Sequence, residues 1–447
     1  MRSTRKARVG VIAMGAVLSL ALAACGSSSS KSGGSSTPSS SSSSAGGSSA
    51  NNNANATEGF TKDSITIEGD VDKTSASGQS EALAELGAKA RFQRANDEGG
   101  INGRKINFLG AADNKLDPSL DLPTVKKIVT QDKAFAIVPM VNPTLSTGGQ
   151  YLIQNKVPFY GWGITPAFCN NDEGFGFSGC LVPLSKDDKV STASAGLMDK
   201  LLGQKDGTGK TVAMIAEDDT AGQFGIKVIQ AAFVADKWTV TYAKPSMPSA
   251  SAVTDFSPYS QAILTSNKGK APDVVFHVTT VPNVEGLSTA LTNAGYKGPQ
   301  ENAVTYDPAF LSNAQSRTAL SNGYVFIQYG SLQAQSDINT QMLKDVQKVQ
   351  PSQKVLTQDI AIGYYSADIF LNHLKKAGSN LSRAAFLKAA NDGSTYEIPN
   401  GLGKLSFPTN HQASVACGSL VQVQGDKYVQ KVPLTCFSNV PLSVLGS

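Results

Sequence analysis

Short apolar runs recur along the chain from residue 64 onward, and most are followed by segments in which apolar residues recur at helical spacing. Runs of this length, bounded by glycine and polar clusters, predict buried strands. We expect such strands at 64–69, 105–109, 135–138, 157–160, 211–216, 238–242, 273–278, 302–306 and 324–329, with a further strand near 420–423. The alternation of strands with helices predicts an α/β fold of parallel sheets flanked by helices.

The segments between these strands carry apolar stripes at helical spacing. We expect helices at 80–96, 120–131, 187–202 and 358–377, and one that opens at 279–282. The clearest stripe lies within 358–377 and consists of Ile360, Tyr364, Ala367, Leu371 and Leu374. Steps of about four and three residues place such a set on one helix face, which is then buried. Gly378 suits the left-handed position just beyond a helix end.

The stretch 134–166 has the features most typical of a binding site. Asn142 follows its first strand, where it can cap a helix that holds Pro143 in the first turn. Such a helix points free backbone N–H groups at the carboxyl edge of the sheet, where a negative group is favoured. After the second strand, Gly163 leaves room for a ligand to touch the backbone and Thr165 offers a hydroxyl. An ordinary strand–helix–strand unit is the alternative interpretation.

The beginning of the chain predicts export. Basic residues within the first eight positions precede an apolar segment at 9–24 that is too short for a comfortable membrane span. The sequence LAACG at 22–26 follows, and it resembles the bacterial lipobox. There the peptide is cut after residue 24, and the thiol of Cys25 carries a diacylglycerol. A plain signal peptide with an incidental cysteine is the alternative.

The residues after Cys25 predict a flexible tether. Residues 26–55 are mainly Ser, Gly and Asn, with Lys31 as their one charge, so they lack the apolar content to fold. The chain carries a formal charge of +4, and the first 24 residues hold four basic residues and no acidic ones. Their removal leaves 35 basic against 35 acidic residues. This near neutrality offers no basic surplus for a nucleic-acid partner.

Four cysteines remain besides Cys25, and four cysteines allow three pairings. Short local loops favour the pairs Cys169–Cys180 and Cys417–Cys436, and an exported protein meets oxidising conditions. Metal binding is the alternative. Zinc sites usually use closely spaced pairs of ligands, which these four positions do not form.

The motifs that indicate catalysis or nucleotide binding are weak or missing. His277, His373 and His411 are the only histidines, and none belongs to an HExxH motif. Residues 203–211 hint at a phosphate-binding loop, but the first glycine is out of register and the segment precedes a strand instead of following one. Residues 217–219, Glu-Asp-Asp, could hold a metal ion, although acidic residues at a strand end more often start helices.

Five segments of the body stand in an informative order. They read SITIEGDVDKTSASGQ, NDEGGINGRKINFLGAADNKLDP, KVPFYGWGITP, APDVVFHVTTVPNVEGLSTALTNAGYKGP and AIGYYSADIFLNHLKKAG. Together they resemble the type I periplasmic solute-binding proteins of ABC importers, in the leucine/isoleucine/valine-binding branch. The resemblance covers nearly all of residues 58–425.

The resemblance implies a fold of two lobes joined by three crossovers, each lobe a parallel sheet flanked by helices. Lobe 1 would comprise 58–183 and 331–410, and lobe 2 would comprise 184–330 and 411–447. The signal peptide would occupy 1–24 and the lipid-anchored tether 25–57. The ligand would lie in the cleft, and the lobes would close on it by hinge bending.

The resemblance also implies binding positions. In the family, a Ser or Thr at a helix start, together with a backbone group and a Thr after the next strand, holds the carboxylate and amine of an amino acid. Asn142 stands at the first of these positions, and Gly163 and Thr165 match the second pair. The acidic residue that binds the amine corresponds to Asp307.

Other positions depart from the family pattern. The aromatic residues that cover the ligand in the family correspond to Ser77, Ala221 and Thr280, none of which is aromatic. Trp162 and Tyr306 offer stacking surfaces instead. The resemblance therefore implies a pocket that differs from the amino-acid pattern, and a larger or different polar ligand fits this difference.

The function implied is that of a lipoprotein on the outer face of the bacterial cell membrane. It would capture a small polar solute, an amino acid or a related compound, and deliver it to an ABC permease as a monomer. No enzymatic activity, cofactor, metal or nucleic-acid partner is expected. The alternative is a sensing pair of lobes that signals to a membrane partner without transport. An extracellular hydrolase is a third hypothesis, with only the weak motifs above in its favour.

Overall fold

The computed structural model describes residues 52–249 and 251–446. The predicted signal peptide, Cys25 and most of the predicted tether lie outside this part of the chain. At its beginning, the amide of Asn53 donates to the carbonyl of Leu381 at 2.6 Å, and Arg104 donates to the carbonyl of Asn53 at 2.6 Å. Residues just before the body are thus bonded to it. Within the described ranges, no helix has the length and apolarity needed to cross a membrane.

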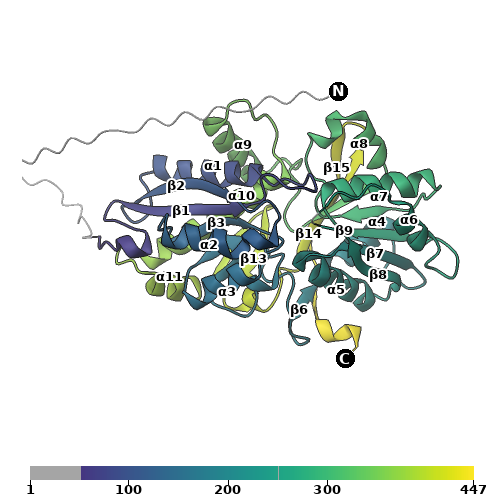
Figure 1. The fold of residues 1–447 in the computed structure, drawn as a ribbon, viewed down its shortest axis with the longest axis horizontal. Helices are drawn as coiled ribbons and strands as arrows, with labels where there is room; N and C mark the ends of the chain where they lie inside the picture. The colour runs from purple at the N-terminus through teal and green to yellow at the C-terminus, as the bar shows by residue number, and fades with distance from the viewer. Residues whose placement is uncertain (1–51, 250, 447) are drawn as a thin grey trace, which may run out of the picture. The chain divides into compact units, whose positions relative to one another are not determined.

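Lobe 1 is built on a five-stranded parallel sheet of order β2-β1-β3-β4-β5 (Figure 1). Its strands are β1 (Ser64–Val71), β2 (Lys105–Asp113), β3 (Ala136–Val141), β4 (Phe159–Gly161) and β5 (Gly174–Gly176). Its helices are α1 (Leu83–Asp97), α2 (Asp121–Thr130), α3 (Thr147–Gln154), α9 (Asp337–Val349), α10 (Gln358–Ala377) and α11 (Arg383–Ala390). Strand β3 is buried on both faces: Val138 packs in the core that includes α1 and α10, and Ile137 in the core beneath α2 and α3.

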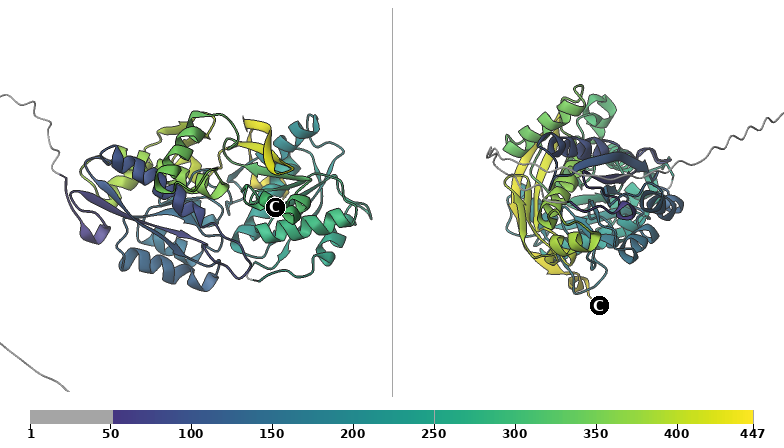
Figure 2. Two further views of the ribbon diagram at one scale, coloured as in Figure 1. Left: turned by 90° about the horizontal axis from the view of Figure 1, so that it is seen from above. Right: turned by 90° about the vertical axis from the view of Figure 1, so that its left-hand side faces the viewer.

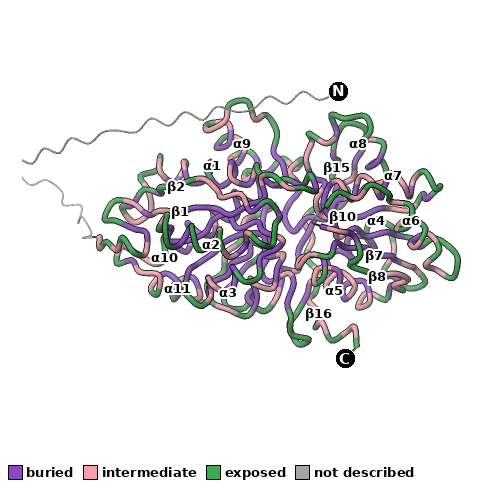
Figure 3. The backbone as a smooth tube through the Cα atoms, in the orientation of Figure 1, coloured by how far each residue is buried: buried purple, intermediate pink, exposed green. Residues whose placement is uncertain are grey.

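Lobe 2 is built on a seven-stranded sheet of order β15-β14-β11-β10-β9-β7-β8. Strands β7 (Thr211–Glu217), β8 (Thr239–Met247), β9 (Val274–Val278), β10 (Gln300–Asn302) and β11 (Gly323–Ile327) run parallel. The hairpin of β14 (Cys417–Gln424) and β15 (Lys427–Cys436) joins β11 antiparallel. The helices are α4 (Ala193–Leu202), α5 (Thr220–Ala235), α6 (Ser257–Leu264), α7 (Val281–Asn293) and α8 (Ala314–Ala319). The central strands of both sheets are buried (Figure 3).

Smaller elements connect or flank the sheets. Strand β6 (Lys189–Ser191) pairs with β16 (Asn439–Pro441), and β12 (Thr395–Ile398) pairs with β13 (Leu402–Ser406). Short 3-10 helices lie at Ala56–Glu58, Pro118–Leu120, Pro166–Phe168, Phe310–Ser312, Thr409–His411 and Leu442–Leu445. The chain passes between the sheets after β5, after β11 and before β14, and Figure 2 shows the late, yellow strands beside elements from the middle of the chain.

Both predicted cystine pairs are confirmed. Cys169 is bonded to Cys180, and Cys417 is bonded to Cys436. The second pair joins directly opposed residues of β14 and β15. Each bond therefore closes a short local segment, as the spacing predicted.

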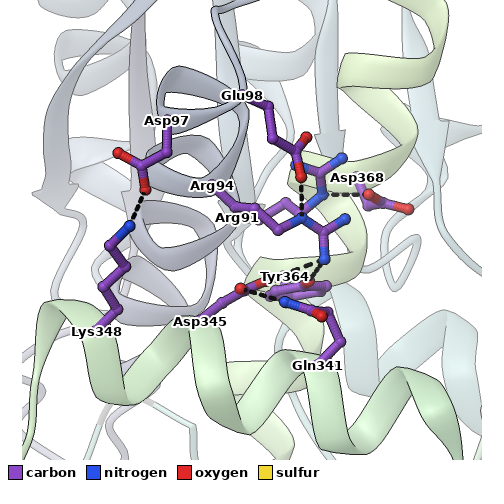
Figure 4. Close-up of polar contacts among 9 residues, drawn as sticks. All are labelled: Arg91, Arg94, Asp97, Glu98, Gln341, Asp345, Lys348, Tyr364 and Asp368. Carbon is purple, nitrogen blue, oxygen red and sulfur yellow. Dashed lines mark hydrogen bonds and ion pairs between the residues drawn. The ribbon is translucent and has the colours of Figure 1, made fainter.

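Ion pairs attach α9 and α10 to α1 (Figure 4). Arg91 on α1 pairs with Asp368 on α10, and Arg94 on α1 donates to Asp345 on α9 at 3.1 Å. The hydroxyl of Tyr364 donates to the same Asp345 at 2.6 Å. These two ion pairs join helices of lobe 1 that are about 250 residues or more apart in the sequence.

Among the predicted elements whose bounds differ in the structure, two differ for one physical reason. The helix expected at Asn142 begins at Thr147, because the Asn142 side chain accepts from the backbone N–H of Thr144 at 2.9 Å and closes a turn. The strand expected at 302–306 ends at Asn302, because that side chain accepts from the backbone N–H of Thr305 at 2.9 Å. In both places an asparagine side chain competes with the regular backbone pattern.

Candidate ligand-binding site

A cavity of about 170 Å³ lies between the two lobes. Lobe 1 contributes Gln79 and Glu81 from the loop after β1, Pro143 from the loop after β3, and Trp162 and Ile164 from the segment after β4. Lobe 2 contributes one face of α5 and the carboxyl ends of β7, β9 and β11. These wall segments follow strands of two open α/β sheets, which is the place where such folds bind ligands.

The wall is mainly apolar along α5. Ala221, Val228 and Ile229 lie on the face of α5 that lines the cavity, together with two glycines of the same helix. Phe276 and Phe326 line it from β9 and β11. Ala221 and Ile229 are eight positions apart, which corresponds to about 12 Å along a helix. The cavity is therefore flanked by an extended apolar surface.

Acidic groups gather where β7 ends. One carboxylate oxygen of Glu217 accepts from the backbone N–H of Thr280 at 2.8 Å, from its hydroxyl at 2.6 Å, and from the amide of Asn283 at 2.6 Å. The carboxylate of Asp219 accepts from the backbone N–H of Gly222 at 2.7 Å and caps α5. Glu217 thereby ties β7 to the start of α7.

Burial without a cation shifts the titration of these groups. Desolvation raises the pKa of Glu81 to about 8, and the nearby charge of Asp72 adds to this effect. Desolvation also raises the pKa of Asp219 to about 7 and raises that of Glu217. Of residues 52–249 and 251–446, no lysine or arginine lines the cavity. The wall therefore holds carboxyl groups with no fixed positive charge beside them.

Several polar side chains of the wall are buried without a partner. Ser194 Oγ, His277 Nδ1 and Thr279 Oγ1 have no hydrogen-bond partner among the described residues, although at most 6% of each residue is exposed. Burial lowers the pKa of His277 to about 4, so its ring is neutral near pH 7. Buried polar atoms are normally paired, and atoms left without a partner in a cavity wall are available to a ligand.

Direct hydrogen bonds join the lobes at the rim of the cavity. The backbone N–H of Val281 donates to the side-chain oxygen of Gln79 at 3.0 Å. The indole N–H of Trp162 donates to the side-chain oxygen of Gln328 at 3.3 Å. The backbone N–H of Ala221 donates to the carbonyl of Pro143 at 3.3 Å. The structure therefore has its lobes in contact around the cavity.

Comparison with known proteins identifies the family. A family model described as periplasmic binding protein matches residues 65–427. The chain belongs to the periplasmic binding protein family. Solved structures show that this periplasmic binding protein has the two-lobed type I fold that the sequence predicted. The family consists of solute-binding proteins and not of enzymes. A comparison with curated proteins found no match.

Solved structures share the fold of this periplasmic binding protein at low identity. It is similar to a fatty acid ABC transporter substrate-binding protein from Thermomonospora curvata, with a TM-score of 0.66, 16% identity, and coverage of 85% of this chain and 94% of that one. A possible leucine/isoleucine/valine-binding protein from Rhodopirellula baltica has a TM-score of 0.67 and 14% identity, and the match covers 83% of this chain and 97% of that one. A solute binding protein from R. palustris in complex with benzoate has a TM-score of 0.64 and 14% identity, and the match covers 84% of this chain and 98% of that one.

The structure brings three of the sequence-predicted positions to the cavity of this periplasmic binding protein. Trp162, Ala221 and Thr280 lie in its wall. Trp162 lies on the side of lobe 1, and the other two lie at the starts of α5 and α7. Ala221 takes part in a contact between the lobes through its backbone, which no side-chain pattern could indicate.

The structure places the predicted Asn142, Gly163 and Thr165 behind the wall. The amide of Asn142 donates to Asp70 at 3.3 Å, and Thr165 is fully buried outside the cavity lining. A Cβ atom on Gly163 would lie 2.3 Å from the carbonyl oxygen of Gly179. The space that a side chain at this position would occupy is therefore filled by the chain's own backbone, and contact of Gly163 with a ligand stays a prediction.

The predicted Ser77, Tyr306 and Asp307 also lie outside the cavity lining. The hydroxyls of Ser77 and Ser75 are 3.0 Å apart. The hydroxyl of Tyr306 donates to Gln333 and accepts from the backbone N–H of Leu332 at 2.8 Å. The side chain of Asp307 accepts from the backbone N–H of Ala309 at 2.7 Å. Each of these side chains is engaged in local structure.

Sequence reasoning missed Gln79, Glu81, Glu217, Asp219 and His277 as wall residues. It considered residues 217–219 as a metal site or as charges at a helix start, and Asp219 caps α5. The described residues include no group of three or more His, Cys, Asp or Glu side chains arranged around a metal position. The signal that could have found them is their place after a predicted strand and before a predicted helix. Gln79 has the same kind of place in the chain, but its contact with the other lobe could not be predicted, because its partner Val281 is 202 residues away.

Proposed function

We propose that this chain is the extracytoplasmic, lipid-anchored solute-binding component of an ABC importer. The observation that carries the proposal is a cavity walled by both lobes, with hydrogen bonds between the lobes at its rim. A solute in such a cavity contacts both lobes only when they are closed, so its binding favours the closed state. A membrane permease can then distinguish the loaded form from the empty form.

The relatives support this role. Solved structures of the same fold are named as binding proteins of transporters, among them an ABC transporter protein in complex with benzoate and a branched-chain amino acid transporter protein in complex with isoleucine. The family is extracytoplasmic, in keeping with the export signal that the sequence predicts at 1–24 and with the cystine bonds. Cys25 would carry the lipid, and residues 26–55 would let the body reach the permease from its anchor.

The residues proposed to contact the solute are those of the cavity wall. Trp162, Ala221 and Thr280 come from the sequence analysis, and Glu217 and Asp219 come from the structure. Asn142, Gly163 and Thr165, which the resemblance implied for an amino-acid ligand, lie outside the wall. The proposal therefore includes a small-molecule solute but not the amino-acid geometry implied by the resemblance.

A ligand screen tests solute binding. The purified mature protein is screened by thermal shift against amino acids, amides, polyamines, sugars, alcohols and aromatic acids, and hits are measured by calorimetry. We expect one chemical class to raise the melting temperature and to reduce the radius of gyration in solution scattering, because the lobes close. Cells that lack the gene should lose uptake of the same compound. Binding without any effect of the gene on uptake would favour sensing over transport.

A cysteine substitution tests the anchor. Cys25→Ser should release the protein into the medium, because the lipid on that thiol is the proposed membrane attachment. The control is Lys31→Ala in the tether, which keeps Cys25 and should leave the protein in the membrane fraction. Immunoblots of medium and membrane fractions measure both variants. A Cys25→Ser protein that stays in the membrane fraction would contradict the anchor.

A further inference from the structure

The helix starts that could bind an anion are already occupied by side chains of this protein. Free N–H groups at a helix N-terminus are the usual way in which a fold of this kind receives a carboxylate. At α5, Asp219 accepts from Gly222 at 2.7 Å. At α7, the N–H of Val281 donates to Gln79 at 3.0 Å. Both helices contribute to the cavity wall at these starts, and neither leaves these donors to a ligand.

The helix that follows β3 is occupied in the same way. The carboxylate of Asp121 accepts from the backbone N–H groups of Ser146 at 3.1 Å and Gly148 at 2.8 Å, at the start of α3. This is the helix at which the sequence predicted a ligand carboxylate. The negative group favoured by its N-terminus is therefore supplied by the protein itself.

The charges of the wall also disfavour an anionic ligand. Glu81, Glu217 and Asp219 line the cavity, and no cationic side chain does so within the described ranges of the chain. An anionic ligand would be desolvated beside carboxyl groups, with no arginine or lysine to balance its charge. Burial of an unpaired charge is strongly unfavourable, and a nearby like charge adds to the cost.

The rest of the wall indicates what does fit. An apolar cavity of about 150 Å³ in another protein binds benzene, so about 170 Å³ accommodates a ring or a short alkyl chain with a small polar group. Phe276, Phe326, Val228 and Ile229 surround such an apolar body. The acidic oxygens at the end of β7 accept hydrogen bonds, and Ser194 Oγ and Thr279 Oγ1 are unpartnered in the described chain.

We propose that the solute is a mainly apolar molecule, about the size of a substituted benzene or a short alkyl chain, that ends in an alcohol or an amine and carries no anionic group. This inference rests on the proposed function, because it concerns the ligand of the same cavity. The apolar body lies against α5, β9 and β11. The hydroxyl or ammonium group donates to the carboxyl groups at the carboxyl end of β7.

Matched ligands test the proposal. Each probe set keeps one apolar body and changes only the polar end: 2-phenylethanol, 2-phenylethylamine and phenylacetate form one set, and 1-hexanol, hexylamine and hexanoate form the other. Calorimetry on the mature protein at pH 7.5 compares affinities within each set. We expect the alcohol or the amine to bind, and the carboxylate of the same set to bind roughly a hundredfold more weakly or not at all.

A pair of variants identifies the cause of the discrimination. Asp219→Asn keeps an oxygen that can cap α5 but removes the negative charge. The ratio of the dissociation constants of the carboxylate and its matched alcohol should therefore fall by roughly tenfold. The control is Asp218→Asn, because Asp218 is the adjacent carboxylate and lies outside the cavity lining. Its Oδ1 accepts from the backbone N–H of Ser249 at 2.9 Å. This variant should leave the ratio of the dissociation constants unchanged. Melting curves confirm that both variants are folded.

The outcomes separate this proposal from the proposed function. A carboxylate that binds as tightly as its matched alcohol and amine overturns the proposal. So does a protein that ignores both probe sets but binds an amino acid, a sugar or an aromatic acid in the wider screen, and in that case the proposed function stands. A protein that binds nothing in any class and shows no closure in scattering counts against both. An equal response of Asp219→Asn and Asp218→Asn overturns the assignment to Asp219.

Discussion

Two regions of this protein bury acidic side chains, and they do so in opposite ways. Between α1, α9 and α10, Asp345 and Asp368 each face a guanidinium group, from Arg94 and Arg91 (Figure 4). In the wall of the cavity, Glu81 and Asp219 face no cation in the described residues. The first region holds charges in pairs, and the second holds carboxyl groups whose pKa burial raises, to about 8 for Glu81 and about 7 for Asp219.

The difference shows what each region is built for. A paired, buried charge is satisfied within the fold, so the interface of α1, α9 and α10 attaches helices and needs no other molecule. The carboxyl groups of the cavity keep the capacity to accept hydrogen bonds from something else. Burial alone therefore does not identify a functional carboxyl group. What distinguishes the two regions is whether the fold places a cation beside the buried carboxyl group.

The largest expected effect comes from breaking a pair at the helix interface. Arg91→Met leaves Asp368 buried without its cation, since only 16% of that side chain is exposed. Unfolding in urea should show a loss of about 3–5 kcal/mol. The double variant Arg91→Met/Asp368→Leu should recover most of the loss, because no unpaired charge remains.

An exposed pair provides the control for that experiment. Lys210 and Asp273 are 3.7 Å apart, with 42% and 41% of their side chains exposed. Lys210→Ala should cost about 1 kcal/mol or less. A loss at Arg91→Met as small as that of Lys210→Ala would show that the interface is not held by paired charges.

A second effect concerns pH and the unpaired carboxyl group of Glu81. Its pKa is raised from 4.5 to about 8, so the folded state holds a proton that the unfolded state has lost between those values. Stability therefore falls as pH rises through this window, by up to about 1.4 kcal/mol per pH unit from this group. Glu81→Gln should remove this contribution, and urea unfolding at pH 6, 7 and 8 measures the slope. An unchanged slope would contradict the shift.

A third effect concerns the contact between the lobes. Gln79→Ala removes the acceptor of the Val281 N–H, which belongs to the closed arrangement. Ligand affinity should fall by roughly tenfold, because each 1.4 kcal/mol corresponds to a factor of ten. Gln93→Ala is the matched control, since that amide bonds Asp97 on the exposed side of α1. Calorimetry with the ligand from the screen compares both variants, and equal affinities would remove Gln79 from the site.

The smallest expected effect separates the cavity from the position that the sequence favoured. If Thr165 held the ligand, as the resemblance implied, Thr165→Ala would lower affinity by roughly ten- to a hundredfold. The structure places its hydroxyl outside the wall, fully buried and with no partner in the described chain. We therefore expect unchanged affinity and no loss of stability. A tenfold loss of affinity would return the site to the loop after β4.

Much of the fold was predictable because it depends on local patterns. The stripe from Ile360 to Leu374 predicted a helix at 358–377, and α10 has those bounds. The side chains of this stripe are buried, as its spacing required. The helix predicted at 187–202 begins later, at Ala193, because Lys189–Ser191 pairs with β16 near the other end of the chain. That pairing partner was not visible in the local pattern.

The sequence alone determined the alternating strands and helices, the family, the cystine pairs and the expectation of a site at the carboxyl ends of strands. The tertiary structure decided which side chains form that site. Gln79 meets Val281 and Glu217 meets Thr280 only because the elements that carry them pack together. Strand and helix periodicity depends on neighbours within a few residues. Whether a buried carboxylate lies beside a cation or in a cavity wall depends on segments that are hundreds of residues away in the sequence. Only tertiary packing brings such segments together.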